Sequence, residues 1–281
     1  MFNLGKFRKK QVKAPRILTL ANQKGGVGKT TTAINLGTAL AAVEENVLIV
    51  DLDPQGNAST GLGLDKSKRK ISTYDVMMGR KSLSHAIVET AIPRLHVAPS
   101  TLDLLGAELE LSESARRTYR LKDAIAELIE DRPGSIHERN YSYILVDCPP
   151  SLNLLTINAL AAANSVLVPL QCEFFALEGL SQLLRTVERV RNTLNPDLDI
   201  HGIILTMFDK RNNLSGQVAD DVRAYLGDKV YKTVIPRNVR ISEAPSYGKP
   251  ALLYDHTCSG SQAYIRLASE IIQREKTLRA A

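Results

Sequence analysis

Tryptophan is absent from this 281-residue chain, and cysteine is rare. The three cysteines, Cys148, Cys172 and Cys258, are widely spaced and odd in number. That pattern predicts neither a disulfide framework nor a zinc knuckle. A chain of this length buries enough apolar surface to be stable without disulfides. We therefore expect reduced, mostly buried thiols, as in cytosolic proteins.

Long hydrophobic runs are also missing. The longest, residues 159–170, is interrupted by Asn164, Ser165 and Pro169. A membrane-spanning helix needs about 20 apolar residues, so we expect none here. The apolar run 17–21 that follows the basic N-terminus is too short for a secretory signal. We therefore expect a cytoplasmic protein.

Charge is concentrated at the N-terminus. The net charge is +6, from 36 basic and 30 acidic residues. Residues 1–16 contain six basic residues and no acidic one. Subtracting these six leaves 30 basic against 30 acidic residues, so nucleic-acid binding by the rest of the chain depends on local clusters. We predict a basic arm at 1–15 and one domain at 16–281. The arm is a solvated tail, an auxiliary DNA contact or a weak membrane-surface contact; we favour the first two, since one short arm gives marginal membrane affinity.

Apolar runs of strand length alternate with segments of helical period. This alternation predicts an α/β fold: a single doubly wound, mostly parallel sheet with helices on both faces. We expect strands at 16–22, 46–52, 94–98, 141–146, 165–170, 200–207 and 229–235. We expect helices at 29–43, 73–90, 176–194 and the C-terminus, and one or two within 102–130. Polar loops are expected at 66–70 and 131–140.

A glycine-rich segment, residues 24–31 (KGGVGKTT), joins the first strand to the first helix. Glycines let the backbone turn tightly and direct N–H groups at anionic oxygens, and the following helix N-terminus favours negative charge. Such a loop needs a lysine for the β and γ phosphates and a hydroxyl for Mg²⁺. The segment therefore predicts a P-loop for ATP and Mg²⁺, with these residues around the phosphates: Lys24, Gly25, Gly26, Val27, Gly28, Lys29, Thr30 (the Mg²⁺ ligand) and Thr31.

The loop departs from the ordinary pattern, because Gln23 stands where the first glycine belongs and a second lysine, Lys24, opens it. This resembles the deviant Walker A motif of the MinD/ParA superfamily. The resemblance implies that Lys24 reaches across a homodimer to the partner's nucleotide; a solvated loop lysine is the alternative. If each ATP is completed by the other subunit, ATP holds the dimer together and hydrolysis releases it.

Three aspartates follow predicted strands: Asp51, Asp53 and Asp147. Ligands of open parallel sheets bind at the carboxyl ends of strands, so we expect all three near the nucleotide. Mg²⁺ binds through carboxylates, waters and phosphates. We assign Asp147 to Mg²⁺ through a bound water and Asp51 to a structural or outer Mg²⁺ role. The resemblance of segment 51–57 to the family's second motif implies that Asp53 orients the attacking water; a turn cap is the alternative.

Three further stretches resemble the ParA/Soj chromosome- or plasmid-partitioning branch: 147–151 (DCPPS), 171–180 (QCEFFALEGL) and 235–250 (IPRNVRISEAPSYGKP). The resemblance covers nearly all of the chain after residue 15. It implies that Pro236, Arg237 and Asn238 line an adenine pocket with Met207 nearby. It also implies non-specific binding of double-stranded DNA by the ATP-bound dimer, with Arg211 and Arg240 as candidates by position.

Lys210 and Lys249 are added to the DNA-binding candidates, and Arg237 is a further cation of the same stretch. Arginine and lysine contact phosphates and release counterions without reading bases. A solvated surface charge is the alternative for each. The chain has no helix-turn-helix signature before the phosphate loop, so the longer, operator-binding partition ATPases fit poorly.

The leading hypothesis is a nucleoid-associated DNA-segregation ATPase. The resemblance implies that a ParB-type partner stimulates hydrolysis, which is slow alone because no arginine finger is evident. The alternative is a MinD-like membrane-associated positioning ATPase, but the last segment carries acidic and basic residues and is typical of a packing helix, so no stable membrane association is expected. An iron–sulfur reductase needs two interface cysteines that Cys148 and Cys172 do not match. A small-molecule kinase fits poorly with Lys24.

Overall fold

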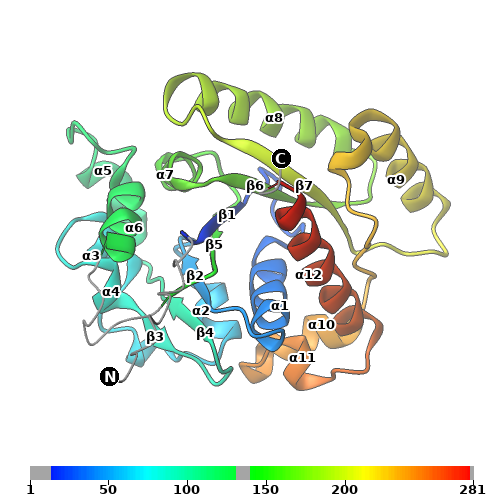
Figure 1. Cartoon of the computed structure of the whole chain (residues 1–281), viewed down its shortest axis with the longest axis horizontal. Helices are drawn as coiled ribbons and strands as arrows, with labels where there is room; N and C mark the ends of the chain where they lie inside the picture. Colours follow the sequence, from blue (N-terminus) through cyan, green and yellow to red (C-terminus); the bar gives the residue numbers. More distant parts are fainter. Residues whose placement is uncertain (1–13, 131–139, 279–281) are drawn as a thin grey trace, which may run out of the picture.

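The computed structural model describes residues 14–130 and 140–278. Seven strands form one sheet in the order β3-β4-β2-β5-β1-β6-β7 (Figure 1). All pairings are parallel except that of β3 with β4. The predicted doubly wound α/β sheet is therefore confirmed. The predicted arm at 1–15 lies almost entirely outside the described residues, as does most of the predicted loop at 131–140.

The strands are β1 Arg16–Leu20, β2 Val47–Asp51, β3 Val88–Glu89, β4 Leu95–Ala98, β5 Tyr143–Asp147, β6 Ser165–Gln171 and β7 Asp199–Thr206. The central strands β2 and β5 are buried along their whole length. Strands covered on both faces need continuous apolar sequence rather than alternation, which is why these runs were recognisable. The predicted strands 16–22, 46–52, 94–98, 141–146, 165–170 and 200–207 are confirmed within a few residues.

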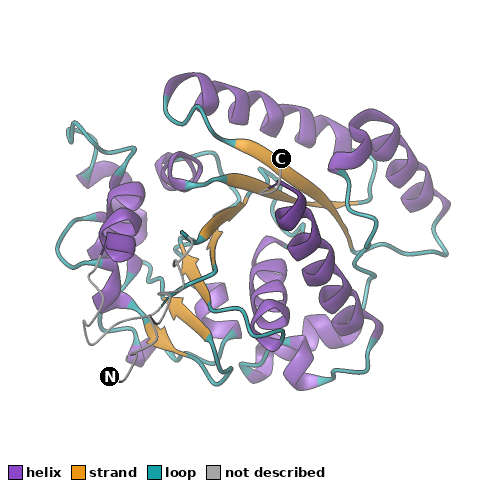
Figure 2. Ribbon diagram, in the orientation of Figure 1, coloured by secondary structure: helices purple, strands orange, loops and turns teal. Residues whose placement is uncertain are grey.

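Helices cover both faces of the sheet (Figure 2). Their apolar side chains belong to two core clusters, one on each side. The first cluster includes side chains of α3 Thr73–Met77, α4 Leu83–Ala86, α5 Leu104–Glu110, α6 Arg120–Glu130, α7 Leu154–Ala162, α8 Ala176–Thr193 and α9 Asn213–Leu226. The second includes side chains of α1 Lys29–Ala42, α2 Asn57–Gly61, α10 Val239–Glu243, α11 Ala251–Tyr254 and α12 Ser259–Leu278. Two hydrophobic layers therefore sandwich the sheet.

Two predicted elements are wrong. The single helix expected at 73–90 is two short helices, α3 and α4, followed by β3. Gly79, just after α3, has a φ of 70°. This left-handed conformation cannot occur inside a continuous right-handed helix, so the helix ends there. The strand expected at 229–235 is absent: after the 3₁₀ turn Gly227–Lys229, the chain only bridges to β7, at Val230. Tyr231 and Ile235 donate to carbonyls of β7, but the segment forms no continuous ladder.

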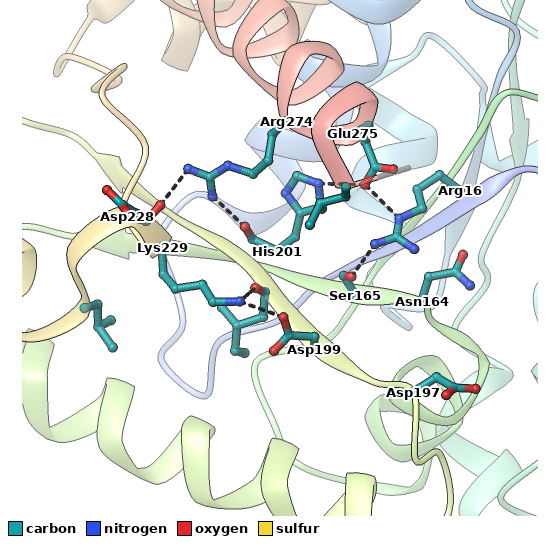
Figure 3. A pocket seen from close by; sticks show the side chains of 13 residues that line it. Arg16, Asn164, Ser165, Asp197, Asp199, His201, Asp228, Lys229, Arg274 and Glu275 are labelled. Carbon is teal, nitrogen blue, oxygen red and sulfur yellow. Dashed lines mark hydrogen bonds and ion pairs between the residues drawn. The ribbon is translucent and has the colours of Figure 1, made fainter. Parts of the chain in front are cut away.

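The C-terminal helix α12 is a packing helix, as expected. Its apolar side chains, among them Tyr264, Leu267 and Ile271, are buried. Near its end, Glu275 accepts hydrogen bonds from Arg16 Nε and His201 Nε2, each 2.7 Å away (Figure 3). His201 also contacts the Tyr231 hydroxyl. This network borders a cavity of about 520 Å³ at the amino ends of β1, β6 and β7, so α12 is fixed to the edge opposite the phosphate loop.

Within the described residues, every helix is too short or too polar to cross a bilayer.

Candidate nucleotide site

The phosphate loop lies between the carboxyl end of β1 and the start of α1. Gly26 and Gly28 have φ of 75° and 89°, the left-handed region that favours glycine. Gly28 precedes α1, and no side chain caps the first turn of that helix. The first N–H groups of α1 therefore have no side-chain acceptor, and together with the helix dipole they attract an anion.

Lys29 is the buried lysine of the loop. Its residue is 6% exposed, and its Nζ donates to the Lys24 carbonyl oxygen at 3.0 Å. Burial lowers the pKa of Lys29, while the nearby Asp147 and Asp53 carboxylates partly oppose this shift. The ammonium group is thus held within the loop, and its contact with phosphates stays a prediction.

Two side chains outside the motif hold the loop in shape. Asn22 donates to the Pro169 carbonyl at 2.8 Å and accepts from the Lys24 backbone N–H at 3.0 Å. Thr206, at the end of β7, donates to the Val27 carbonyl at 2.8 Å. Sequence reasoning missed both. The sequence feature that could have identified them is a polar residue at the carboxyl end of an apolar strand. The loops that form ligand sites in parallel sheets meet at these strand ends.

Asp147, at the end of β5, is the deepest carboxylate of the site. Both of its oxygens are buried and lack a hydrogen-bond partner of acceptable geometry among the described residues. Burial, followed by repulsion from Asp51, raises the pKa of Asp147 well above its ordinary value, and the nearby Thr30 hydroxyl offsets part of this rise. A buried carboxylate without partners is costly unless a cation or a water satisfies it. The residues therefore fit a Mg²⁺ ion held by Thr30 and, through water, by Asp147.

Asp51 has a different environment, although it pairs in register with Asp147 across β2 and β5. Its carboxylate accepts from Ser59 N–H at 2.9 Å, from Ser59 Oγ at 2.7 Å and from Asp53 N–H at 3.2 Å. Burial raises its pKa to about 6, and these hydrogen bonds oppose the rise. Asp51 thus fixes α2 to the sheet; whether it also has an outer role toward Mg²⁺ stays a prediction.

Asp53 lies two residues further along the same segment and is 8% exposed. One carboxylate oxygen accepts from Gln55 N–H at 3.0 Å, and its carbonyl accepts from Gly56 N–H. These contacts are those of a turn cap, and they use only one of the two carboxylate oxygens. The turn and a role toward water are therefore compatible.

Lys24 is placed differently from Lys29. Its side chain is 44% exposed and forms an ion pair with Glu173 of the same chain, which follows β6. Glu173 is followed by Phe174 and Phe175, which are 74% and 61% exposed. The second lysine of the loop therefore lies at the surface beside exposed aromatic rings. The sequence pattern around Glu173 indicates a family resemblance but does not predict its pairing with Lys24.

The predicted adenine residues lie beside the end of β7. Met207 has φ of 50°, and Phe208 bridges to Pro236. Arg237 donates its backbone N–H to the Phe208 carbonyl at 3.0 Å. The Asn238 side chain caps α10 by accepting from Arg240 N–H and also donates to Ser259 Oγ. Its amide thus already has structural partners.

A cavity of about 490 Å³ opens beside these residues and is lined by four basic side chains, Lys210, Arg211, Arg237 and Arg266. The Arg211 side chain is 88% exposed and paired with Asp209, whose pKa the Arg211 hydrogen bond lowers to about 2. Arg240 is 54% exposed and paired with Glu243. Lys249 is exposed as well. All four DNA-binding candidates are therefore accessible, but the two arginines carry acidic partners.

The cysteines agree with the expectation of free thiols. Cys148 and Cys172 are buried, and Cys258 is partly buried. Burial raises the pKa of Cys172 to about 11 and that of Cys148 further. Neither Cys148 nor Cys172 presents a thiolate at the surface, which an interface-shared iron–sulfur cluster requires.

Comparison with known proteins matches the chain over nearly its full length. A family model described as an AAA domain matches residues 15–200. The chromosome partitioning protein ParA of Caulobacter vibrioides is 61% identical over 265 residues, 94% of this chain and 97% of that protein. The sporulation initiation inhibitor protein Soj of Bacillus subtilis is 52% identical over 256 residues, 91% and 98% of the two chains.

Solved structures share the same architecture. The cobyrinic acid a,c-diamide synthase of Mycobacterium smegmatis, determined with a bound ATP analogue and magnesium, has a TM-score of 0.79 at 37% identity, covering 94% of this chain and 96% of that one. The cell division ATPase MinD of Pyrococcus furiosus has a TM-score of 0.74 at 27% identity, covering 92% and 98%.

Proposed function

The chain belongs to the ParA/Soj family of chromosome-partitioning ATPases, and from that membership we propose that it is an ATP-driven switch for DNA segregation. It is a P-loop ATPase of the partition type, and its ligands are ATP and Mg²⁺.

In the proposed site, the chain binds the triphosphate through the phosphate-loop backbone and Lys29. Thr30 and, through water, Asp147 hold Mg²⁺, which supplies charge neutralisation for the phosphates. Asp53 orients the attacking water, while Asp51 keeps the Asp53 segment against the sheet through Ser59. The adenine lies near Met207 and the segment of Pro236, Arg237 and Asn238.

One observation supports the proposed switch. The two lysines of the loop lie in different places: Lys29 is buried inside the loop and Lys24 is at the surface. An exposed lysine at the mouth of a nucleotide site is available to a nucleotide held by a second copy of the chain. Two copies facing each other would then each complete the other's site. ATP would stabilise this homodimer, and hydrolysis would release it.

The dimer binds double-stranded DNA without sequence preference through Arg211, Arg240, Lys210 and Lys249. Because Arg211 and Arg240 are paired with Asp209 and Glu243, DNA phosphates must compete with these carboxylates. A ParB-type centromere-binding partner stimulates hydrolysis and so releases the dimer. The protein is then cytoplasmic and nucleoid-associated.

The test is DNA retention in a gel shift with ADP, ATP and a hydrolysis-resistant analogue over a salt series. We expect retention only with a triphosphate, falling steeply as salt rises. Arg211→Glu or Arg240→Glu should abolish retention with nucleotide affinity unchanged, while Lys122→Glu, an exposed lysine on α6, should not. Equal retention with ADP and ATP contradicts the proposal.

Two further variants separate dimerisation from hydrolysis. Asp53→Ala should keep the dimer on DNA after ATP is added, because hydrolysis no longer releases it. Lys24→Ala should bind ATP but fail to form the productive dimer. A Lys24→Ala protein that dimerises and binds DNA like the unaltered chain contradicts the role given to this lysine.

A MinD-like membrane role is the second candidate, since the MinD structure shares the fold. It needs an amphipathic anchor, but the apolar face of α12 is buried against the core. Sedimentation with anionic liposomes and ATP decides between the two: binding to liposomes but not to DNA favours the membrane role.

A further inference from the structure

A switch requires that the DNA-binding segment respond to the nucleotide. We define the DNA segment as residues 236–250, which include Arg240 and Lys249. We propose that Asn35, in α1, positions the DNA segment against the phosphate-loop helix, and that contact between Gly63 and Gly248 joins the same segment to the end of α2, the helix that follows Asp53. This inference rests on the proposed function and concerns its regulation.

Asn35 links the two regions directly. It is 2% exposed. Its Nδ2 donates to the Thr31 carbonyl at 2.8 Å, and its Oδ1 accepts from the Ala251 backbone N–H at 2.8 Å. Thr31 follows the Mg²⁺ candidate Thr30, and Ala251 follows the DNA segment. One buried amide therefore ties the first turn of α1 to the residue that directly follows the DNA segment.

A second contact starts from Thr32, the residue directly after the phosphate loop. Thr32 Oγ1 and the buried Tyr264 hydroxyl are 3.2 Å apart, which joins α1 to α12. At its start, α12 packs under α10: a Cβ at Gly260 would lie 2.2 Å from Ile241 Cδ1. Ile241 is the neighbour of Arg240. The DNA segment is thus connected to α1 at two places, through α11 and through α12.

The third contact joins the DNA segment to the residues just after α2, the short helix that follows the Asp53 turn. A Cβ at Gly63 would lie 2.9 Å from the Gly248 carbonyl oxygen, and a Cβ at Gly248 would lie 3.0 Å from Gly63 Cα. Both glycines have positive φ, 81° and 62°. The backbones of Gly63 and Gly248 therefore pack directly against each other. A displacement of one segment is for this reason transmitted to the other.

These contacts explain how two parts of the nucleotide site could both influence the conformation of the DNA segment. A triphosphate that orders the first turn of α1 would also order the DNA segment, because the buried Asn35 side chain links the two. The backbone contact between Gly63 and Gly248 would couple the end of α2 to the same segment. A ligand shifts an equilibrium only by its differential affinity for the two states. The measurable quantity is therefore the ratio of DNA affinities with a hydrolysis-resistant ATP analogue and with ADP.

The experiment measures this ratio for Asn35→Ala by fluorescence anisotropy with a labelled duplex, together with affinity for a fluorescent ATP analogue. We expect the ratio to fall by about tenfold, a typical coupling between sites. Nucleotide affinity should stay within about threefold, since Asn35 does not face the phosphates. Asn195→Ala is the matched control, because Asn195 is also a buried amide, bonded to the Leu160 and Ala163 carbonyls.

Gly63→Ala is the second variant, and Gly79→Ala is its control. Both glycines have positive φ, 81° and 70°, so the backbone strain is similar, but only Gly63 faces Gly248. We expect Gly63→Ala to lower the ratio and Gly79→Ala to leave it unchanged. An unchanged ratio in both Asn35→Ala and Gly63→Ala, or an equal loss in the controls, overturns the inference. A wild-type ratio of one overturns the proposed switch itself.

Discussion

Removal of the Glu173 carboxylate tests whether Lys24 must give up its ion pair within the same chain before it can act in a dimer. In the structure, Lys24 is paired with Glu173 of the same protomer. In the dimer we propose, the Lys24 ammonium contacts the partner's nucleotide, so this pair must break or be weakened. Glu173→Gln should therefore favour the dimer, because the substituted amide is neutral and holds the ammonium less strongly.

The free energy of this ion pair can be judged from the solvent exposure of its two side chains. The Lys24 and Glu173 side chains are 44% and 32% exposed. Solvent screens such a pair, which contributes about 0.5 kcal/mol. A dimer contains two pairs, so breaking both costs about 1 kcal/mol, or a factor of about five in its dissociation constant. We expect the dimer of Glu173→Gln to be about fivefold tighter.

Sedimentation velocity with Mg²⁺ and a hydrolysis-resistant ATP analogue, over a range of protein concentrations, measures this constant. Glu178→Gln is the control, since Glu178 is an exposed acid of the first turn of α8. High salt should reduce the difference between Glu173→Gln and the wild type, because salt screens the pair. A weaker dimer for Glu173→Gln would refute the reasoning, since Glu173 would then act across the interface.

Three other changes test the site and the fold. Asp147→Asn should lower the affinity for Mg²⁺ with ATP, measured by titration of Mg²⁺ against hydrolysis rate, and an unchanged Mg²⁺ dependence would contradict the metal role. Thr206→Val removes the buried bond to the Val27 carbonyl and should weaken ATP binding by about tenfold, from the roughly 1–3 kcal/mol cost of an unpaired buried acceptor; calorimetric titration checks it. Glu275→Gln should lower the free energy of unfolding by about 1–3 kcal/mol near pH 7. Burial opposes ionisation of Glu275, but hydrogen bonds from His201 and Arg16 dominate and lower its pKa below the ordinary 4.5. Its ionised form therefore stabilises the fold above about pH 4.5, and this contribution is lost as the pH falls through the lowered pKa. The difference from wild type in urea unfolding should shrink in acid, and a constant difference would refute this account.

Local pattern alone determined much of this protein. Strands buried on both faces read as continuous apolar runs, so β2 and β5 were recognisable without tertiary information. The phosphate loop was predicted because glycines and Lys29 must be contiguous to surround an anion. The helix at 73–90 and the strand at 229–235 were wrong because both depended on tertiary context: a left-handed turn at Gly79, and a neighbouring β7 to which the second segment only bridges.

Only the tertiary structure decided which residues act together across the chain. Lys24 and Glu173 are 149 residues apart, and Asn35 and Ala251 are 216 apart. Sequence distance carries no information about such pairs, since their proximity depends on the order of the strands and on which face each helix covers. The same holds for the environment of Asp147: its residue type and place were visible in the sequence, but its complete burial results from packing against its neighbours, among them the adjacent strands β1 and β2.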